Sequence, residues 1–303
     1  MERRRGRWAI ATVGALLAAL LVQGLAFAAG PVRFANGEPD NDTQLSELTP
    51  AEAAFVQKKL AMAAATATTG TPTIRSGNKL APMYACEFDP CEDPTPPSWP
   101  PPGGPSPAKT LATRARQQNN YYFCGPASGQ VVINWTRGIS STSTNGEDLS
   151  TNWRRQSKIA TWMNTTSLGT GGASLAAGLN NSNGVVKPTA DWVYTYADNG
   201  TMQAFFNKIL TDIDGFGMPL VLATAPHMAN AGVDYLESWP REYPGAHHWI
   251  VVRGYDGLWG APSILIKYQD SSAGFGGATG SFDDSLSVVY QVSKANQGGH
   301  VVW

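Results

Sequence analysis

Two segments in the C-terminal third carry the pattern of adjacent β-strands. The first, HHWIVVRGYDG from His247, is rich in β-branched and aromatic residues and ends at an Asp-Gly turn signal. The second, SILIKYQDSS from Ser263, alternates apolar and polar residues before it reaches a carboxylate. Both segments predict strands, and the alternation of side chains tests whether they pair antiparallel.

Antiparallel pairing brings an imidazole to a carboxylate. If residue 248 lies opposite residue 270, apolar partners meet along the same face of the two strands. Directly opposed side chains lie about 5 Å apart at Cβ, close enough for Asp270 to orient His248. His247 then points to the other face, although a bulge near residue 247 would exchange the two histidines.

Apolar periodicity predicts several further elements. The predicted helices are LTPAEAAFVQKKLAMAAA from Leu48, PASGQVVINW from Pro126, NWRRQSKIATWMN from Asn152 and MQAFFNKIL from Met202. GMPLVLAT predicts a buried strand leading toward His227, and ADWVYTYAD predicts a strand-like segment. The Gly- and Asn-rich SLGTGGASLAAGLNNSNG predicts a surface loop that lines the cleft.

The first of these helices has a clear N-terminal signal. Thr49 is placed to cap it, Pro50 fits the first turn, and Glu52 completes a capping box. Phe55, Val56 and Leu60 predict a narrow apolar stripe. Two interpretations stay open: a propeptide helix that covers and inhibits an active site, or a helix on a poorly ordered leader.

The N-terminus MERRRGRWAIATVGALLAALLVQGLAFAAG combines a basic start, an apolar run and a small-x-small site. This order is typical of a secretory signal peptide, so we expect cleavage near Ala28 and a secreted protein without stable membrane insertion. The alternative is an uncleaved anchor, because the apolar run is nearly long enough to span a bilayer. The arginines leave the general and the twin-arginine export routes open.

Composition shifts divide the remainder of the chain. Residues 1–28 are the predicted signal, residues 29–92 a leader with one helix, and residues 93–107 a Pro-rich linker that holds its backbone extended. Residues 108–303 are expected to form one catalytic domain. The net charge of -1 leaves no basic patch for a nucleic-acid partner.

The three cysteines point to different roles. Cys86 and Cys91 bracket a short turn, and an oxidising compartment favours a local disulfide between them. Unpaired thiols or partners on another chain are the alternatives. Cys124 is then left over, at the N-terminus of a predicted helix whose macrodipole favours a thiolate. We therefore interpret Cys124 as a nucleophile and not as a core residue.

A thiolate of this kind needs a donor for the oxyanion that it creates. RQQNNYYFC offers the amides of Gln117 and Gln118 beside the backbone N–H of Cys124. No cofactor or metal is expected, because the adjacent His247 and His248 face opposite ways on a strand and do not converge with Cys124 on a zinc ion.

These motifs together resemble the C-thirty-nine-like cysteine peptidases, papain-fold enzymes related to those that trim bacteriocin leader peptides. The resemblance rests on Gln118 six residues before Cys124, on YFCGPAS, on HWIVVRGYD and on the strand that ends at Asp270. It covers the chain from about Ala108 onward. It implies an α+β papain-like fold, in which an N-terminal catalytic helix packs on an antiparallel β-sheet.

The resemblance also implies roles for four residues. Gln118 completes the oxyanion hole and Cys124 attacks the substrate. His248 is the base, and Asp270 orients it. The expected function is that of a secreted cysteine peptidase acting on peptides or proteins.

Two departures and two other functions bear on this interpretation. The family often has Asp-Pro where this chain has Asp270-Ser271, and a glycine where it has His247. A cell-wall amidase or endopeptidase would use the same chemistry, but its usual Asp-Cys pair before a serine is missing. A non-catalytic binding module would lack one of the four roles, whereas this chain has a candidate for each.

Overall fold

The computed structural model describes residues 49–68, 104–139, 155–180, 184–225, 236–239, 247–273, 277–296 and 299–303. The chain separates into two units, residues 1–36 and 37–303, and all described residues belong to the second. The predicted signal, most of the leader, the start of the Pro-rich segment, Cys86 and Cys91 lie outside the described residues. None of the helices in the described part of the chain has the length and apolarity that a bilayer crossing needs.

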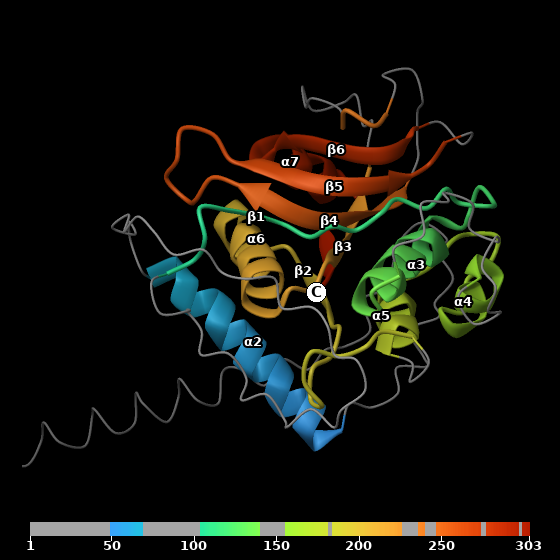
Figure 1. Ribbon diagram of the computed structural model, residues 1–303, viewed down its shortest axis with the longest axis horizontal. Helices are drawn as coiled ribbons and strands as arrows, with labels where there is room; N and C mark the ends of the chain where they lie inside the picture. Colours follow the sequence, from blue (N-terminus) through green and yellow to red (C-terminus); the bar gives the residue numbers. More distant parts are fainter. Residues whose placement is uncertain are drawn as a thin grey trace, which may run out of the picture. The chain divides into compact units, whose positions relative to one another are not determined.

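One antiparallel sheet organises the described chain (Figure 1). Its central order is β2-β7-β3-β4-β5-β6, and β1 pairs with β4 beside β3. The strands are β1 Ala108–Thr110, β2 Tyr196–Asp198, β3 Leu220–Thr224, β4 His248–Asp256, β5 Leu265–Ser271, β6 Thr279–Ser285 and β7 His300–Val302. β4 is the longest strand, and β3 and β1 share one of its edges while β5 lines the other.

The predicted pairing of the two histidine- and aspartate-bearing strands is correct in direction but wrong in register. Val252 pairs with Tyr268, two residues away from the predicted partner, and Arg253 forms a bulge before Gly254 pairs with Lys267. Up to Val252 the shift is two residues, which leaves each side chain on its predicted face because the side-chain period of a strand is two. After the bulge the shift is three residues, so Gly254 lies on the face opposite to the predicted one. The predicted face is therefore correct as far as Val252, although the predicted opposed pairs are wrong throughout.

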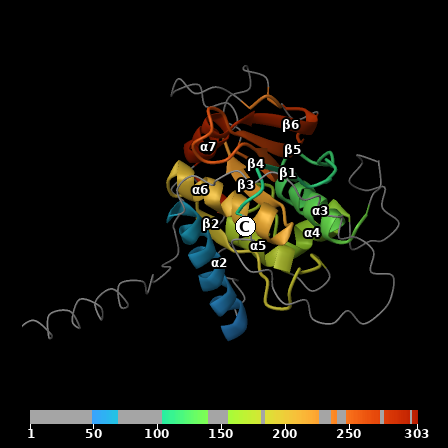
Figure 2. The ribbon, with the colours of Figure 1, turned by 60° about the vertical axis from the view of Figure 1, so that its left-hand side comes forward.

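Helices cover both faces of this sheet (Figures 1 and 2). They are α2 Pro50–Thr68, α3 Cys124–Thr136, α4 Gln156–Trp162, α5 Gly172–Asn180, α6 Met202–Ile209, the π-helix η3 Leu210–Phe216 and α7 Leu286–Ala295. α3 packs on β4 with α4 and α5 beside it. α6 and η3 lie together, and α2 packs against both of them.

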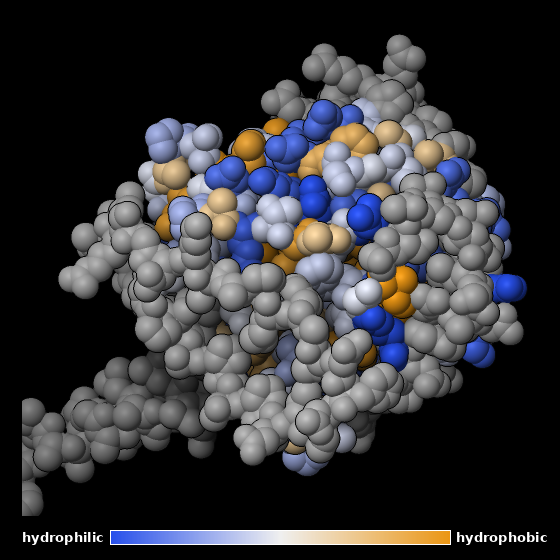
Figure 3. Space-filling view, viewed as in Figure 1, coloured by the Kyte–Doolittle hydropathy of each residue, from blue (hydrophilic) through white to orange (hydrophobic). Residues whose placement is uncertain are grey.

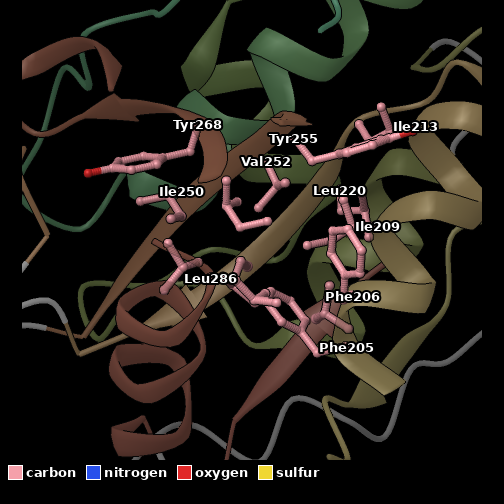
Figure 4. Packing of buried hydrophobic residues seen from close by; sticks show 14 of the residues in the cluster. Phe205, Phe206, Ile209, Ile213, Leu220, Ile250, Val252, Tyr255, Tyr268 and Leu286 are labelled. Atoms are coloured by element: carbon pink, nitrogen blue, oxygen red, sulfur yellow. The ribbon is translucent and has the colours of Figure 1, made fainter. Parts of the chain in front are cut away.

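The two faces of the sheet bury separate apolar clusters. Ile250 and Val252 of β4 face the first cluster, together with Phe205, Phe206 and Leu286 (Figure 4). The intervening residues of β4 face the second cluster, which contains side chains of α3, α4 and α5. This alternation explains why β4 reads as an almost unbroken apolar run, since both of its faces are buried.

The predicted surface loop between residues 167 and 184 is wrong over its second half. Residues 172–180 form α5, a helix that is buried along most of its length. Its glycines serve close packing: a Cβ on Gly172 would overlap the ring of Tyr196, and one on Gly178 would overlap Met163. The Gly-rich sequence predicts a loop because glycine in a packed helix and glycine in a turn look alike in sequence.

α2 has the predicted start and a different buried face. The backbone N–H of Glu52 donates to Thr49 Oγ1 at 3.3 Å, and that of Thr49 donates to Glu52 Oε2 at 3.1 Å, which is the expected capping box. The predicted apolar stripe is correct at Phe55, which is buried, and wrong at Leu60, which is 40% exposed while Lys59 is fully buried. An ionic side chain thus occupies the position at which an apolar one was expected.

The outer strand β6 is polar and partly exposed, with the sequence TGSFDDS. Hydrophilic residues dominate the surface over β5 and β6 (Figure 3). Acidic side chains on an edge strand discourage pairing with another chain. β6 leads directly into α7, where Ser285 caps the helix by accepting a hydrogen bond from the N–H of Val288.

The packing of α5 can be tested with two neighbouring glycines. We expect Gly172→Ala to destabilise the protein by about 1–3 kcal/mol, because the new methyl group meets the Tyr196 ring. Gly171→Ala is the matched control, since a Cβ at Gly171 has no atom within 4 Å. Chemical denaturation of both variants checks this; equal stabilities would contradict the packing described.

Candidate active site

Cys124 is the first residue of α3, as the sequence predicts, and Pro126 lies in the first turn. It is the one free cysteine among the described residues, and its side chain is buried. Gly125 lets the helix start approach Thr170, whose Oγ1 lies 2.5 Å from where a Cβ would stand. Ser128 Oγ donates to the carbonyl of Trp249 at 3.1 Å and so fixes α3 on β4.

His248 begins β4, and Asp270 is the penultimate residue of β5. His248 Nε2 lies 2.8 Å from Asp270 Oδ1, and both side chains are buried. An ionised carboxylate only accepts hydrogen bonds, so the ring nitrogen is the donor. Continuing the observed register places Asp270 diagonally across from His248, a separation that these side chains span.

The Cys124 side chain also acts on this imidazole and raises the pKa of His248. Because Nε2 is engaged by Asp270, Nδ1 is the ring nitrogen that remains for the sulfur. Cys124 belongs to the apolar cluster on one face of the sheet, and Trp239, beside His248, belongs to the cluster on the other. The site therefore lies where the two layers meet at the start of β4.

The electrostatics of the pair favour a charged imidazole. Burial by itself lowers the pKa of His248, but the Asp270 carboxylate, followed by Cys124, raises that pKa to about 10. Burial raises the pKa of Asp270, and the charge and hydrogen bond of His248 more than offset this, so the net pKa is lowered. At neutral pH the structure thus supports an imidazolium–carboxylate pair.

Asp270 has a full set of donors besides His248. Ser272 donates to Oδ1 through its N–H at 3.0 Å and its hydroxyl at 2.8 Å. Ser238 Oγ donates to Oδ2 at 2.7 Å, and Trp239 Nε1 donates to it at 2.9 Å. The Trp239 ring also packs against the His248 ring, with centroids 5.1 Å apart. These groups hold the carboxylate ionised in a buried place.

The segment that carries Ser238 and Trp239 is itself anchored. The Ser238 carbonyl accepts the N–H of Ala278 at 2.8 Å, and the Glu237 N–H donates to Asp284 Oδ2 at 2.9 Å. Sequence reasoning missed both Ser238 and Trp239, since nothing local to them signals a partner on β5. Ser272, two residues after Asp270, could have been found, because a serine there can fold back on the carboxylate.

Both candidate glutamines lie beside the chain that leads to Cys124. The Gln118 side-chain amide donates to the carbonyls of Asn120 at 2.9 Å and Tyr121 at 3.2 Å. The backbone N–H of Gln118 donates to the Ser271 carbonyl at 2.8 Å. Gln118 is buried between the loop and the end of β5. Gln117 instead donates to the carbonyl of Ala273 at 3.2 Å, toward the surface.

The other histidines lie elsewhere. His247 is exposed and its Nδ1 lies 3.2 Å from Asn296 Oδ1, so it points away from the partners of His248. His300 lies on β7 with Nδ1 3.0 Å from Asp198 Oδ1. His227 lies outside the described residues. Within the described ranges, no three of the residue types His, Cys, Asp and Glu gather in a way that could hold a metal ion.

A sulfur at the N-terminus of a helix thus acts on an imidazole that is hydrogen-bonded to a carboxylate. The imidazole can hold the thiol proton and the carboxylate can stabilise the resulting cation. The first backbone N–H groups of α3 point into the same region and have no partner within the helix. This arrangement can support nucleophilic attack on a carbonyl and binding of the oxyanion that forms.

Residues 110–277 match the model of the Peptidase_C39 like family. The match contains the entire candidate site, whereas α2, α7 and β7 lie outside it. A search of curated proteins finds no match to this sequence. The fold class expected from the sequence is confirmed, since the helix that begins at Cys124 packs on an antiparallel sheet in an α+β, papain-like arrangement.

Two solved structures are similar over part of the chain. The bromelain protease from Ananas comosus is 12% identical, with a TM-score of 0.36, over 65% of this chain and 97% of that one. The digestive procathepsin L2 proteinase from the larval midgut of Tenebrio molitor is 13% identical, with a TM-score of 0.31. That alignment covers 63% of this chain and 64% of the procathepsin.

The charged state of His248 predicts how stability depends on pH. Its pKa is about 10 in the folded protein and about 6.5 when unfolded, so its contribution is complete below pH 6.5 and is lost as pH rises toward 10. Two variants are compared, Cys124→Ala and Cys124→Ala/His248→Gln. Both lack the thiol, so they differ only in the imidazole. The difference in unfolding free energy should shrink by a few kcal/mol between pH 6.5 and 10. A pH-independent difference would contradict the pairing.

Trp239→Phe should keep an aromatic ring beside His248 and remove the donor to Asp270 Oδ2. A hydrogen bond to a charged group is worth about 1.5–3 kcal/mol, so unfolding free energy should fall by that amount. The histidine pKa, followed by NMR, should fall as well, because the carboxylate is held less well. Trp259→Phe, at a 41% exposed indole, is the control. An unchanged histidine titration in Trp239→Phe would mean that Trp239 only fills space.

Proposed function

Because the chain belongs to the Peptidase_C39 like family, we propose that it is a secreted cysteine peptidase that hydrolyses peptide bonds. The observation that carries this proposal is the buried hydrogen bond between His248 and Asp270, together with Cys124 at the start of α3, which raises the pKa of the same imidazole. Peptides or proteins are the proposed substrates, in keeping with a family of peptidases.

In the proposed reaction, His248 already holds the proton of Cys124 as an imidazolium, and the Cys124 thiolate attacks the carbonyl carbon of the substrate. A thioester forms when the C–N bond breaks, and the His248 imidazolium returns the proton to the leaving amine. Asp270 stabilises the imidazolium and keeps Nδ1 directed at the sulfur. Water, deprotonated by His248, then hydrolyses the thioester and regenerates the thiol.

The oxyanion of each tetrahedral intermediate is assigned to two donors, the Cys124 backbone N–H and the Gln118 amide. In the free protein both protons of that amide point to loop carbonyls, those of Asn120 and Tyr121. The longer of these bonds, to Tyr121 at 3.2 Å, is the one we expect a bound substrate to displace. The Asn120 bond then holds the amide in place during the reaction.

The remainder of the proposal concerns parts of the chain outside the described residues. The sequence of residues 1–28 supports export and cleavage near Ala28. Export to an oxidising compartment would allow Cys86 and Cys91 to pair, leaving Cys124 as the reactive thiol. The proposed location is therefore extracellular, with the leader attached to the catalytic domain until it is processed.

Alkylation of the mature protein tests the nucleophile and the base together. Cys124 should react with iodoacetamide at neutral pH at least about tenfold faster than a model thiol, because the imidazolium stabilises its thiolate. Cys86 and Cys91 should remain unlabelled until reduction. Mass spectrometry of digested adducts locates the label, and equal labelling of all three cysteines would contradict the proposal.

The two adjacent histidines give a matched pair of variants. His248→Ala should abolish alkylation at neutral pH and peptide hydrolysis, because the proton acceptor is lost. His247→Ala should be nearly silent, since that ring is exposed and directed to Asn296. Both rates are measured on one casein-derived substrate after folding is checked by circular dichroism. If His247→Ala were inactive and His248→Ala active, His248 would not be the base.

A further inference from the structure

α2 carries a lysine that is fully buried in the catalytic domain. Lys59 Nζ lies 2.9 Å from Asp212 Oδ1 and 3.2 Å from Oδ2, and neither side chain has any exposed surface. Lysine is almost never fully buried unless it is paired. The pairing joins a helix at residues 50–68 to the π-helix η3, far along the chain.

Two indole rings complete the pocket around this ammonium group. Lys59 Nζ lies 4.5 Å from the ring centroid of Trp192 and 4.7 Å from that of Trp303. Both tryptophans are fully buried. A cation within about 6 Å of an aromatic face is attracted by the ring quadrupole, more strongly when water is excluded. An acidic group and two aromatic walls therefore recognise one ammonium group.

Residues of α2 on either side of Lys59 also contact the domain, through apolar side chains and one ion pair. One turn earlier, Phe55 packs against Phe216 with ring centroids 5.6 Å apart. One turn later, Met62 is buried as well. Near the helix start, Glu52 Oε1 accepts a hydrogen bond from Lys187 Nζ at 3.0 Å. The buried residues of α2 therefore recur at helical spacing and form one face, which packs on the rest of the domain.

A buried ion pair contributes more to selectivity than to stability. Burial disfavours both charges: it lowers the pKa of Lys59, and it raises the pKa of Asp212 to about 6 in spite of the lysine. Losing one partner leaves the other charge uncompensated, which is far costlier than replacing both with apolar groups. Any helix register that does not deliver an ammonium group to Asp212 is therefore rejected.

We propose that Asp212, Trp192 and Trp303 form a lysine-binding site that holds residues 49–68 on the catalytic domain after the connecting chain is cut. α2 is then a retained second chain of the processed protein and not a leader that is lost. The partner chemistry is specific: an amphipathic helix that presents a lysine one turn after a phenylalanine.

α2 lies away from the helix that begins at Cys124, so its binding to the domain can be studied separately from catalysis. α2 packs on α6 and η3, and in Figures 1 and 2 it lies beside α6 while α3, which begins at Cys124, lies with α4 and α5. α2 and Trp303 also fall outside the family match, although Trp192 and Asp212 fall within it. Whether the leader blocks the active site and whether α2 is retained are therefore separate questions. Measuring whether the two pieces stay bound after cleavage answers only the second.

The experiment cuts the folded protein between α2 and the catalytic domain. A recognition sequence for a site-specific protease is inserted after Gly77 in the otherwise complete chain, ahead of Cys86, so that no disulfide can join the two pieces. After cleavage, size-exclusion chromatography with mass spectrometry should show the N-terminal piece co-eluting with the C-terminal piece. Separation of the two while the C-terminal piece keeps its near-ultraviolet circular dichroism would overturn the proposal.

Two neighbouring lysines provide matched variants of the cut protein. Lys59→Met should weaken retention of the N-terminal piece at least about 100-fold, because Asp212 is left buried without its partner. Lys58→Met changes an exposed lysine on the same helix and should be retained like the unmodified chain. Lys59→Met/Asp212→Leu removes both charges and should recover most of the retention. Equal retention of the Lys58→Met and Lys59→Met pieces would show that no lysine site exists.

Discussion

The buried bond between His248 and Asp270 is the constraint on which the rest of the site depends. A carboxylate and an imidazole without access to water are tolerated only if every charge has partners. Asp270 obtains them from three directions: the strand opposite, the turn after its own strand, and the segment around Ser238. The ionisation of the pair beside Cys124 is therefore supported by groups from three separate segments of the chain.

The sheet supplies the geometry for this pair, and the helix supplies the third member. Small residues at the start of α3 allow its N-terminus to approach Thr170, and Ser128 fixes its distance from β4. The site therefore combines one rigid helix end with two strand ends, all held by buried packing on both faces of the sheet. Elements of this kind place catalytic groups more reliably than loops do.

The sequence predicts the fold class and brings the three candidate residues together, while their catalytic roles stay a prediction. Cys124, His248 and Asp270 could be found because their signals are local: a helix start, an alternating strand and a face with a period of two. The exact register could not, because the bulge at Arg253 depends on how β1 and β3 share one edge of β4. α5 and the partners of Asp270 were missed for the same reason, since each depends on a contact between distant segments.

Lys59 also shows why a short apolar pattern misassigned the buried face of α2. The sequence contains no sign that Asp212 and two tryptophans converge on one point, and one of those tryptophans is Trp303. This has a consequence for how the protein is made. α2 emerges from the ribosome early, but its pocket cannot close until the chain through Trp303 is complete. Until Trp303 has been added, Lys59 lacks one of the two indole rings of its pocket, so the docking of α2 is completed later than the contact of Phe55 with Phe216 allows.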